Sequence, residues 1–154
     1  MKLEKMNQSD FEVWAPQSRH GYAERKIQSN GLTKSKAYEI AEEEFARLLP
    51  DGLASKDNYF YTMKDSDSRV VGYLWFCIRG AVDSRAAFLC DIDVNENCRG
   101  HGIGKSAMLQ FEQEVKKLGL KEIGLQVFAF NAKAIRLYQS LGFRTTKLVM
   151  SKSF

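Results

Sequence analysis

The sequence predicts one α/β domain in which an antiparallel meander leads into a parallel pair of strands. The first of three observations is a largely helical pattern up to Pro50, and the second is a run of three strand-like segments joined by short turns. The third is an alternation of strand and helix patterns after residue 104. Because a strand–helix–strand unit implies a parallel pair with a right-handed crossover, the sheet is predicted to be mixed. The 154 residues, 44% of them hydrophobic, suffice for one core and are few for two domains.

A short strand over residues 2–6 and two helices are predicted in the N-terminal third. Ser9 and Asp10 are candidate N-caps of the first helix, which Pro16 should interrupt or restart because proline has no backbone N–H. The second helix begins near Thr33 or Ser35, both of which suit an N-cap. Its apolar residues recur at spacings of three and four and form one packed face: Tyr38, Ala41, Phe45 and Leu48.

The meander consists of strand patterns at residues 59–63, 70–78 and 86–94. A helix follows the glycine-rich segment and ends near Gly119, where a helix C-cap is expected. Its apolar stripe contains Met108, Phe111, Val115 and Leu118. The remaining pattern predicts a strand over 123–130, a helix over 131–141 and a closing strand over 143–150.

Composition and charge argue against several classes of partner. The formal charge of +4 comes without a long run of like charges, so neither a nucleic acid nor a membrane surface is expected to bind. The N-terminus lacks an apolar signal-peptide core and no window approaches the roughly 18 apolar residues of a membrane span, which predicts a cytoplasmic protein. The three cysteines form no CxxC pair and the chain has only two histidines, so neither a disulfide framework nor a metal site is predicted.

Gly100, Gly102 and Gly104 alternate between a predicted strand and a predicted helix. Glycines there let the backbone approach a ligand, and the free N–H groups of the first helical turn favour an anion such as phosphate. The segment GHGIGK does not fit the dinucleotide pattern GxGxxG, and the P-loop pattern would need a glycine where Arg99 stands. A glycine-rich turn without a ligand is the alternative.

Two segments together resemble the GNAT superfamily of N-acetyltransferases. The sequence Arg99-x-x-Gly102-x-Gly104 is similar to the family's pyrophosphate loop for acetyl-CoA, written [QR]-x-x-G-x-[GA]. The segment from Asn131 to Phe143, with Leu137-Tyr138-x-x-Leu141-Gly142-Phe143, resembles the family's downstream helix and strand. The resemblance implies a GNAT acyltransferase fold, with helices on both faces and a splayed parallel pair that holds the pantetheine arm. It implies one GNAT domain over 1–154, in which 59–154 bind acetyl-CoA and 1–58 shape the acceptor site.

The resemblance also implies roles for individual residues. The strand backbone would bind pantetheine, the loop amides would bind pyrophosphate, and Asn131 would position the pantetheine end or the amine. The implied acetyl-CoA-binding residues are Ile92, Asp93, Val94, Arg99, Gly100, His101, Gly102, Ile103, Gly104, Lys105, Asn131 and Tyr138. For Lys105, a solvated lysine is an equal alternative.

Tyr138 and Asp91 are the candidate catalytic residues. Tyr138 matches the family's tyrosine that protonates the departing CoA thiolate; a core tyrosine is the alternative. An alkylamine of pKa about 10.4 is almost fully protonated at neutral pH, so a base or desolvation must produce its reactive form. Asp91, which matches an acidic residue of polyamine acetyltransferases, is the first candidate and Asp93 the second; a carboxylate bonded only to its neighbours is the alternative.

The predicted function is direct transfer of an acetyl group from acetyl-CoA to a primary amine on a small molecule, polyamine or protein. Two nearby carboxylates, if unpaired, would favour a positively charged amine. The alternative is a non-catalytic acyl-CoA-binding module. The sequence leaves open whether the chain forms a homodimer.

Overall fold

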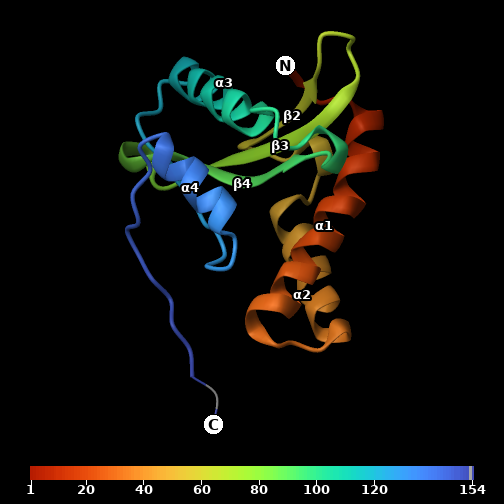
Figure 1. Cartoon of the computed structure of the whole chain (residues 1–154), viewed down its shortest axis with the longest axis vertical. Helices are drawn as coiled ribbons and strands as arrows, with labels where there is room; N and C mark the ends of the chain where they lie inside the picture. The colour runs from red at the N-terminus through yellow and green to blue at the C-terminus, as the bar shows by residue number, and fades with distance from the viewer. Residues whose placement is uncertain (153) are drawn as a thin grey trace.

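A five-stranded sheet in the order β1-β2-β3-β4-β5 forms the centre of this computed structural model, which describes residues 1–152 and 154 but not the side chain of Asn30 (Figure 1). The first four strands pair antiparallel, and β5 pairs parallel to β4. The strands are β1 Lys2–Lys5, β2 Asn58–Lys64, β3 Val70–Arg79, β4 Ala86–Val94 and β5 Ile123–Leu125. The predicted meander and the predicted mixed sheet are both confirmed.

Helices cover both faces of the sheet, as predicted. Figure 1 shows α1 and α2 on one side of the sheet and α3 on the other. The helices are α1 Gln8–Asn30, α2 Lys34–Leu48, α3 Ile103–Lys117 and α4 Ala132–Ser140. No helix in residues 1–152 combines the length and apolar character that crossing a membrane requires.

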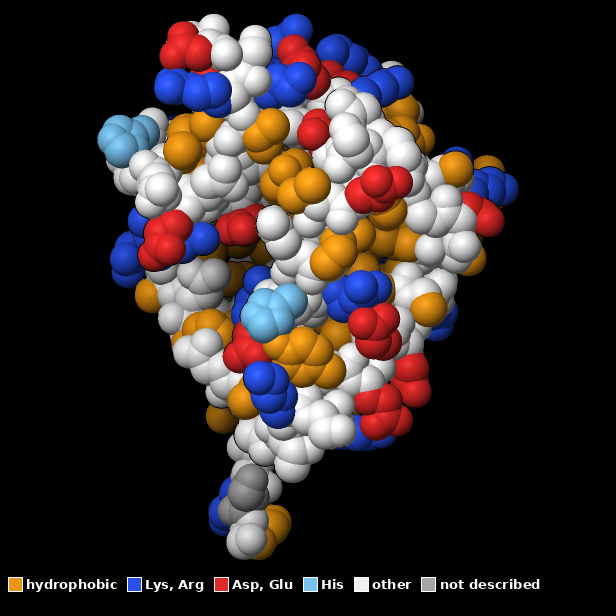
Figure 2. Space-filling view, turned by 90° about the vertical axis from the view of Figure 1, so that its right-hand side faces the viewer, with side chains coloured by type: hydrophobic (Ala, Val, Ile, Leu, Met, Phe, Trp, Pro, Cys, Tyr) orange, Lys and Arg blue, Asp and Glu red, His pale blue; other side chains and the backbone are white. Residues whose placement is uncertain are grey.

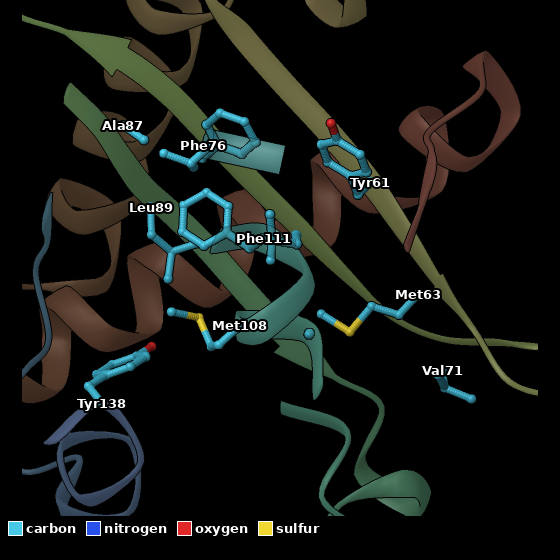
Figure 3. Packing of buried hydrophobic residues seen from close by; sticks show 12 residues of the cluster. Tyr61, Met63, Val71, Phe76, Ala87, Leu89, Met108, Phe111 and Tyr138 are labelled. Atoms are coloured by element: carbon cyan, nitrogen blue, oxygen red, sulfur yellow. The ribbon is translucent and has the colours of Figure 1, made fainter. Parts of the chain in front are cut away.

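The α3-side core lies between α3, α4 and the sheet. Figure 3 shows Met108 and Phe111 of α3 directed at the sheet, where Phe111 and Phe76 lie 4.8 Å apart between ring centroids. Its buried residues are Tyr61, Met63, Val71, Leu74, Phe76, Ala87, Leu89, Ala107, Met108, Phe111, Val115 and Tyr138. Leu118 of the predicted stripe remains 41% exposed.

The α1-side core fills the opposite face. It consists of Met6, Phe11, Trp14, Phe45, Phe60 and Trp75. Strand β3 contributes to both cores, because side chains alternate along a strand: Leu74 and Phe76 face α3, and Trp75 faces α1. The sheet is therefore buried on both sides through its centre.

Helix α1 does not break at Pro16, contrary to the prediction. Its N-cap is Asn7, whose side chain accepts a hydrogen bond from the Asp10 amide at 2.8 Å. Pro16 is exposed, so water can bind the Glu12 carbonyl that proline leaves without a donor. Burial of Trp14 and the apolar contacts of this helix with α2 stabilise α1 on both sides of Pro16. The predicted second helix is confirmed, with Thr33 as its N-cap.

The predicted strands at the C-terminal end are only partly present. The strand predicted over 123–130 is limited to β5, and residues 143–150 form no strand. A strand needs a neighbour to accept and donate its backbone hydrogen bonds, and no strand of the described chain lies beside this segment. Apolar alternation alone therefore does not produce a strand there.

Candidate functional site

The backbone pairing between strands β4 and β5 ends about halfway along β4. Their pairing runs from Ala87 opposite Ile123 to Leu89 opposite Leu125, whereas β4 continues to Val94. Beyond Leu89, the β5 side of β4 has no strand partner within the described residues. Ile92, Asp93 and Val94 lie in this unpaired stretch. An extended ligand chain can hydrogen-bond to such a backbone as an added strand would.

The glycine-rich loop brings a set of free amides to the end of this stretch. Gly100 and Gly102 adopt left-handed conformations with φ of 88° and 75°, which favour glycine. In the described chain, no backbone or side-chain acceptor binds the amides of residues 100–105. The start of α3 adds the positive end of its dipole to these donors. A Cβ atom at Gly100 or Gly102 would meet nothing within 4 Å, so the loop faces open space.

Other loop residues have smaller roles in the geometry. Gly104 lies inside α3, where a Cβ atom would make an ordinary 3.5 Å contact with Leu137. His101 is exposed, with Nδ1 3.4 Å from the Cys98 carbonyl oxygen. Ile103 packs toward the α3-side core, and Lys105 is exposed in the first turn of α3.

Arg99 connects the loop to β4. Its Nε donates to the Val94 carbonyl at 2.8 Å, and its guanidinium pairs with Asp93 at 3.1 Å. Asp93 is 62% exposed and its charge is balanced by Arg99. The side chain of Arg99 therefore fixes the loop, and the backbone amides provide the unpaired positive potential.

A β-bulge determines where Asp91 points. Trp75 pairs with Asp91 and Phe76 pairs with Leu89, which leaves Cys90 as the extra residue. Cys90 packs in the α1-side core, and Asp91 also turns toward α1, where it accepts a hydrogen bond from the Ser18 hydroxyl. Without the bulge, strand alternation would place Asp91 on the same face as Leu89, which packs in the α3-side core.

Asp91 is a buried carboxylate with two polar partners on α1. Its side chain is 11% exposed, and Arg25 lies 3.7 Å from its Oδ1. Burial raises the pKa of Asp91, which the Ser18 hydrogen bond and the Arg25 charge partly offset. The buried indole N–H of Trp14 forms no hydrogen bond with this carboxylate or with any other acceptor in the described structure.

Tyr138 of α4 lies at the edge of the α3-side core and near Asp91. Figure 3 shows its ring beside Met108, with the hydroxyl directed toward the core. Burial raises the pKa of Tyr138, and the negative charge of Asp91 raises it further. No hydrogen bond of its hydroxyl is found among the described residues, and the hydroxyl oxygen is not a fully buried unsatisfied atom, so it retains some contact with solvent. The structure thus brings the two predicted catalytic side chains within electrostatic reach of each other.

Asn131 caps helix α4. Its Oδ1 accepts a hydrogen bond from the Ala134 amide at 3.2 Å, while its own side chain is exposed. The capping bond uses one oxygen and leaves the side-chain NH₂ group free of this role.

Sequence reasoning missed Ser18 and Arg25 as partners of Asp91. Together with Trp14 they occupy one face of α1, since their spacings of four and seven residues correspond to one and two helical turns. This periodicity was the available signal, and the expected break at Pro16 hid it.

In the described residues, neither the surface charges on the α1 side nor the potential metal ligands form a concentrated cluster. Figure 2 shows acidic and basic side chains interspersed over the face on which α1 lies, without a continuous patch of either sign. Within residues 1–152, no cluster of three or more histidine, cysteine or acidic side chains is arranged to hold a metal ion.

Comparisons of the sequence and of the structure with known proteins both find acetyltransferases. The sequence model of the acetyltransferase (GNAT) family matches residues 23–143. Two uncharacterized N-acetyltransferases of Bacillus subtilis, YdgE and YycN, are 29% and 30% identical over 150 residues, covering 97% of this chain and 96% of each relative. The crystal structure of YycN superimposes with a TM-score of 0.94 over 99% of this chain and 98% of that one. Thialysine N-epsilon-acetyltransferase of Mus musculus is 36% identical over 76 residues, which cover 49% of this chain and 45% of the mouse protein.

Proposed function

Because this chain belongs to the acetyltransferase (GNAT) family, we propose that it transfers the acetyl group of acetyl-CoA directly to a primary amine. The observation that carries the proposal is the row of amides from residues 100–105 without acceptors, at the end of the unpaired stretch of β4. A pyrophosphate group bound by these amides would leave the pantetheine arm to run beside Ile92, Asp93 and Val94.

The loop fits a pyrophosphate on grounds of space and charge. Glycine at positions 100 and 102 leaves the approach to the amides open, and the helix dipole favours an anion. Lys105 supplies a mobile positive charge at the same helix end, whereas Arg99 acts through its bonds to Asp93 and Val94.

Tyr138 is proposed as the general acid. Acetyl transfer forms a bond from the amine nitrogen to the thioester carbon and breaks the carbon–sulfur bond, and the departing thiolate needs a proton. The raised pKa of Tyr138 keeps its phenol protonated at neutral pH, and its hydroxyl is not committed to a partner in the described structure.

Asp91 is proposed to receive the proton of the attacking amine or to anchor that amine. A carboxylate whose pKa is raised by burial is a better proton acceptor than an exposed one, and α1 holds it in place through Ser18. Both Asp91 and Asp93 have arginine partners, so the excess negative charge on which a preference for cationic amines depended is not present. The proposed acceptor remains a primary amine of unspecified charge, supported by the name of the thialysine enzyme, which implies that class for that relative.

The direct test supplies acetyl-CoA and a panel of primary amines to the purified chain and measures the CoA thiol released. We expect amine-dependent thiol release and an acetylated product with the mass of the amine plus one acetyl group. Tight acetyl-CoA binding without transfer to any amine would instead indicate an acyl-CoA-binding module.

A matched pair of loop variants tests the binding step separately. Asparagine and aspartate both tolerate the positive φ of Gly102 and have nearly the same shape, so Gly102→Asn and Gly102→Asp differ mainly in charge. The aspartate should weaken CoA binding by on the order of 10-fold or more relative to the asparagine, since it sets a negative charge against the bound anion. Equal affinities of the two variants by calorimetry would place the pyrophosphate elsewhere.

A further inference from the structure

Two cysteines from neighbouring strands are in contact on the α1 side of the sheet. The Sγ atom of Cys90 in β4 lies 3.3 Å from the Sγ atom of Cys77 in β3. Cys77 pairs with Phe88, and alternation along β4 places Cys90 on the same face as Phe88, two residues further on. Both cysteines are free thiols in this structure. Because the sulfurs of a disulfide are about 2.0 Å apart, a bond needs only a short further approach of two side chains that already touch.

An arginine lies directly beside this pair. The Nε–H of Arg79 donates to the Sγ atom of Cys77 at 3.3 Å, and the guanidinium carbon lies 3.5 Å from the centre of the Phe88 ring, which holds the charge in place. The hydrogen bond from the Cys90 thiol and the adjacent guanidinium lower the pKa of Cys77 to about 6. Donation to Cys77 and burial raise the pKa of Cys90, so Cys90 keeps its proton.

The two thiols therefore differ in the way that a disulfide-forming pair requires. A thiolate is the form that reacts with an oxidant, and a thiol next to it can displace the oxidised group. Arg79 is exposed and Cys90 is only partly buried, so the pair lies within reach of a small solute. The third cysteine, Cys98, packs toward the α3-side core and has no cysteine partner in the described part of the chain.

We propose that Cys77 and Cys90 form a reversible disulfide in the presence of a hydroperoxide, with the Cys77 sulfur beside Arg79 as the attacking atom. With hydrogen peroxide, this sulfur forms a bond to one oxygen, the O–O bond breaks, and the released hydroxide takes up the proton that Cys77 lost on ionising. The Cys90 sulfur then loses its proton and attacks the Cys77 sulfur. An S–S bond forms, the S–O bond breaks, and the departing hydroxide takes up that proton. Two thiols are thereby oxidised by two electrons, and one peroxide is reduced to two molecules of water.

The position of the pair connects this modification to the candidate site. Cys90 is the extra residue of the β-bulge that directs Asp91 toward α1. The disulfide therefore ties the bulge to β3 one residue before Asp91.

The first experiment treats the folded chain with hydrogen peroxide at low protein concentration and then alkylates the remaining thiols in denaturant. We expect the three free thiols to fall to one, and a protease digest to contain the peptides of Cys77 and Cys90 joined together. Dithiothreitol should restore all three thiols. Cys98→Ser is the control, and both of its thiols should be lost at the rate of the original pair.

Single cysteine variants separate the two roles. In Cys90→Ser the sulfenic acid on Cys77 has no thiol to displace it, so dimedone, a reagent for sulfenic acids, should label Cys77. In Cys77→Ser, the remaining Cys90 has a raised pKa and no arginine at its sulfur, so dimedone labelling of Cys90 should be weaker by on the order of 10-fold or more.

The charge at position 79 provides a matched comparison. Arg79→Lys and Arg79→Gln have side chains of similar length and differ in charge. Near neutral pH the glutamine variant should form the disulfide on the order of 10-fold more slowly than the lysine variant, because less of Cys77 is thiolate. The two rates should converge above about pH 9, where an ordinary thiol is also ionised.

Several results would overturn the proposal. These are three thiols that survive peroxide treatment, a disulfide that contains Cys98 or joins two chains, dimedone labelling of Cys90 in preference to Cys77, and a rate at neutral pH that is independent of the charge at position 79. The thiol count and the digest use the original chain, so they remain decisive even if serine at buried position 77 disturbs folding. None of these measurements depends on acetyl transfer, so their outcome is separate from that of the proposed function.

Discussion

Tyr138 has a buried ring and a hydroxyl without a hydrogen bond in the described structure. A variant that keeps the ring and lacks the hydroxyl can therefore distinguish a catalytic role from a packing role. Phenylalanine preserves the ring contacts with Phe143 and the α3-side core and removes only the proton donor. For Tyr138→Phe we expect kcat to fall by on the order of 10²-fold while acetyl-CoA affinity changes little. Steady-state kinetics and calorimetry on the same preparation provide the measurement. An unchanged kcat would leave Tyr138 as a core residue.

The burial of Asp91 has a consequence for stability that depends on pH. A raised pKa in the folded state means that the neutral form is favoured on folding. The associated stability is fully present below the unfolded-state pKa of about 3.9 and is lost as the pH rises through the folded-state pKa. Neutral Asp91→Asn lacks this loss, so its stability relative to the original chain should increase as the pH rises from about 4 to neutrality.

Urea unfolding across this pH range measures the difference, and Asp93→Asn is the matched control. Asp93 is 62% exposed, so removing its charge relieves no comparable cost of burial. A difference between Asp91→Asn and the original chain that stays constant with pH would show that Ser18 and Arg25 fully compensate the buried charge. A pH–rate profile of the same variant, measured with the best amine, reports separately on the proposed role in amine deprotonation.

At the scale of single elements, Pro16 lowers the stability of α1, and the packing of the helix more than compensates for this loss. The helix loses one hydrogen bond at the Glu12 carbonyl, on its exposed side. Pro16→Ala restores the donor and should stabilise the chain by about 2 kcal/mol, a gain reduced by the greater freedom of the unfolded chain. Gln17→Ala, at the neighbouring exposed position, should change stability by less than about 0.5 kcal/mol. A destabilised Pro16→Ala variant would show that proline limits the unfolded state more than it harms the helix.

Element by element, the sequence was sufficient wherever local pattern and tertiary environment agree. The meander follows from alternating residues such as Leu74, Trp75 and Phe76, because both faces of β3 are buried as alternation requires. Thr33, one of the two predicted caps, correctly marks the start of α2, because a helix cap depends only on nearby backbone amides. The glycine loop is also local: Gly100 and Gly102 adopt the positive φ angles that favour glycine, whereas Gly104 lies inside α3.

Features that depend on distant partners were not predictable in this way. The bulge at Cys90 reverses the face on which Asp91 lies, and nothing in the strand sequence requires it. The pairing of Asp91 with Ser18 and Arg25 depends on how α1 crosses the sheet. The strand expected over 143–150 depends on a neighbouring strand, and none lies beside it in the described part of the chain.

For the molecule as a whole, the sheet joins two cores that consist of different residues. Strand β3 places Phe76 in the α3-side core and Trp75 in the α1-side core, so loss of order on one face removes support from the other. The two tryptophans of the chain, Trp14 and Trp75, both lie in the α1-side core, with ring centroids 5.6 Å apart. Tryptophan fluorescence therefore reports on the α1 side, whereas far-UV circular dichroism reports on the whole fold.

Phe111→Ala tests this coupling from the opposite face. Phe111 is fully buried against Phe76, and its truncation should cost about 3–5 kcal/mol, or less for the milder Phe111→Leu. Although no tryptophan contacts this position in the α3-side core, the fluorescence transition in urea should move to lower concentration together with the dichroism transition. Protein concentration is kept equal in all samples, because a dimer would add its own contribution to stability. If the fluorescence midpoint stayed in place while dichroism showed an earlier step, the two faces would unfold as separate units.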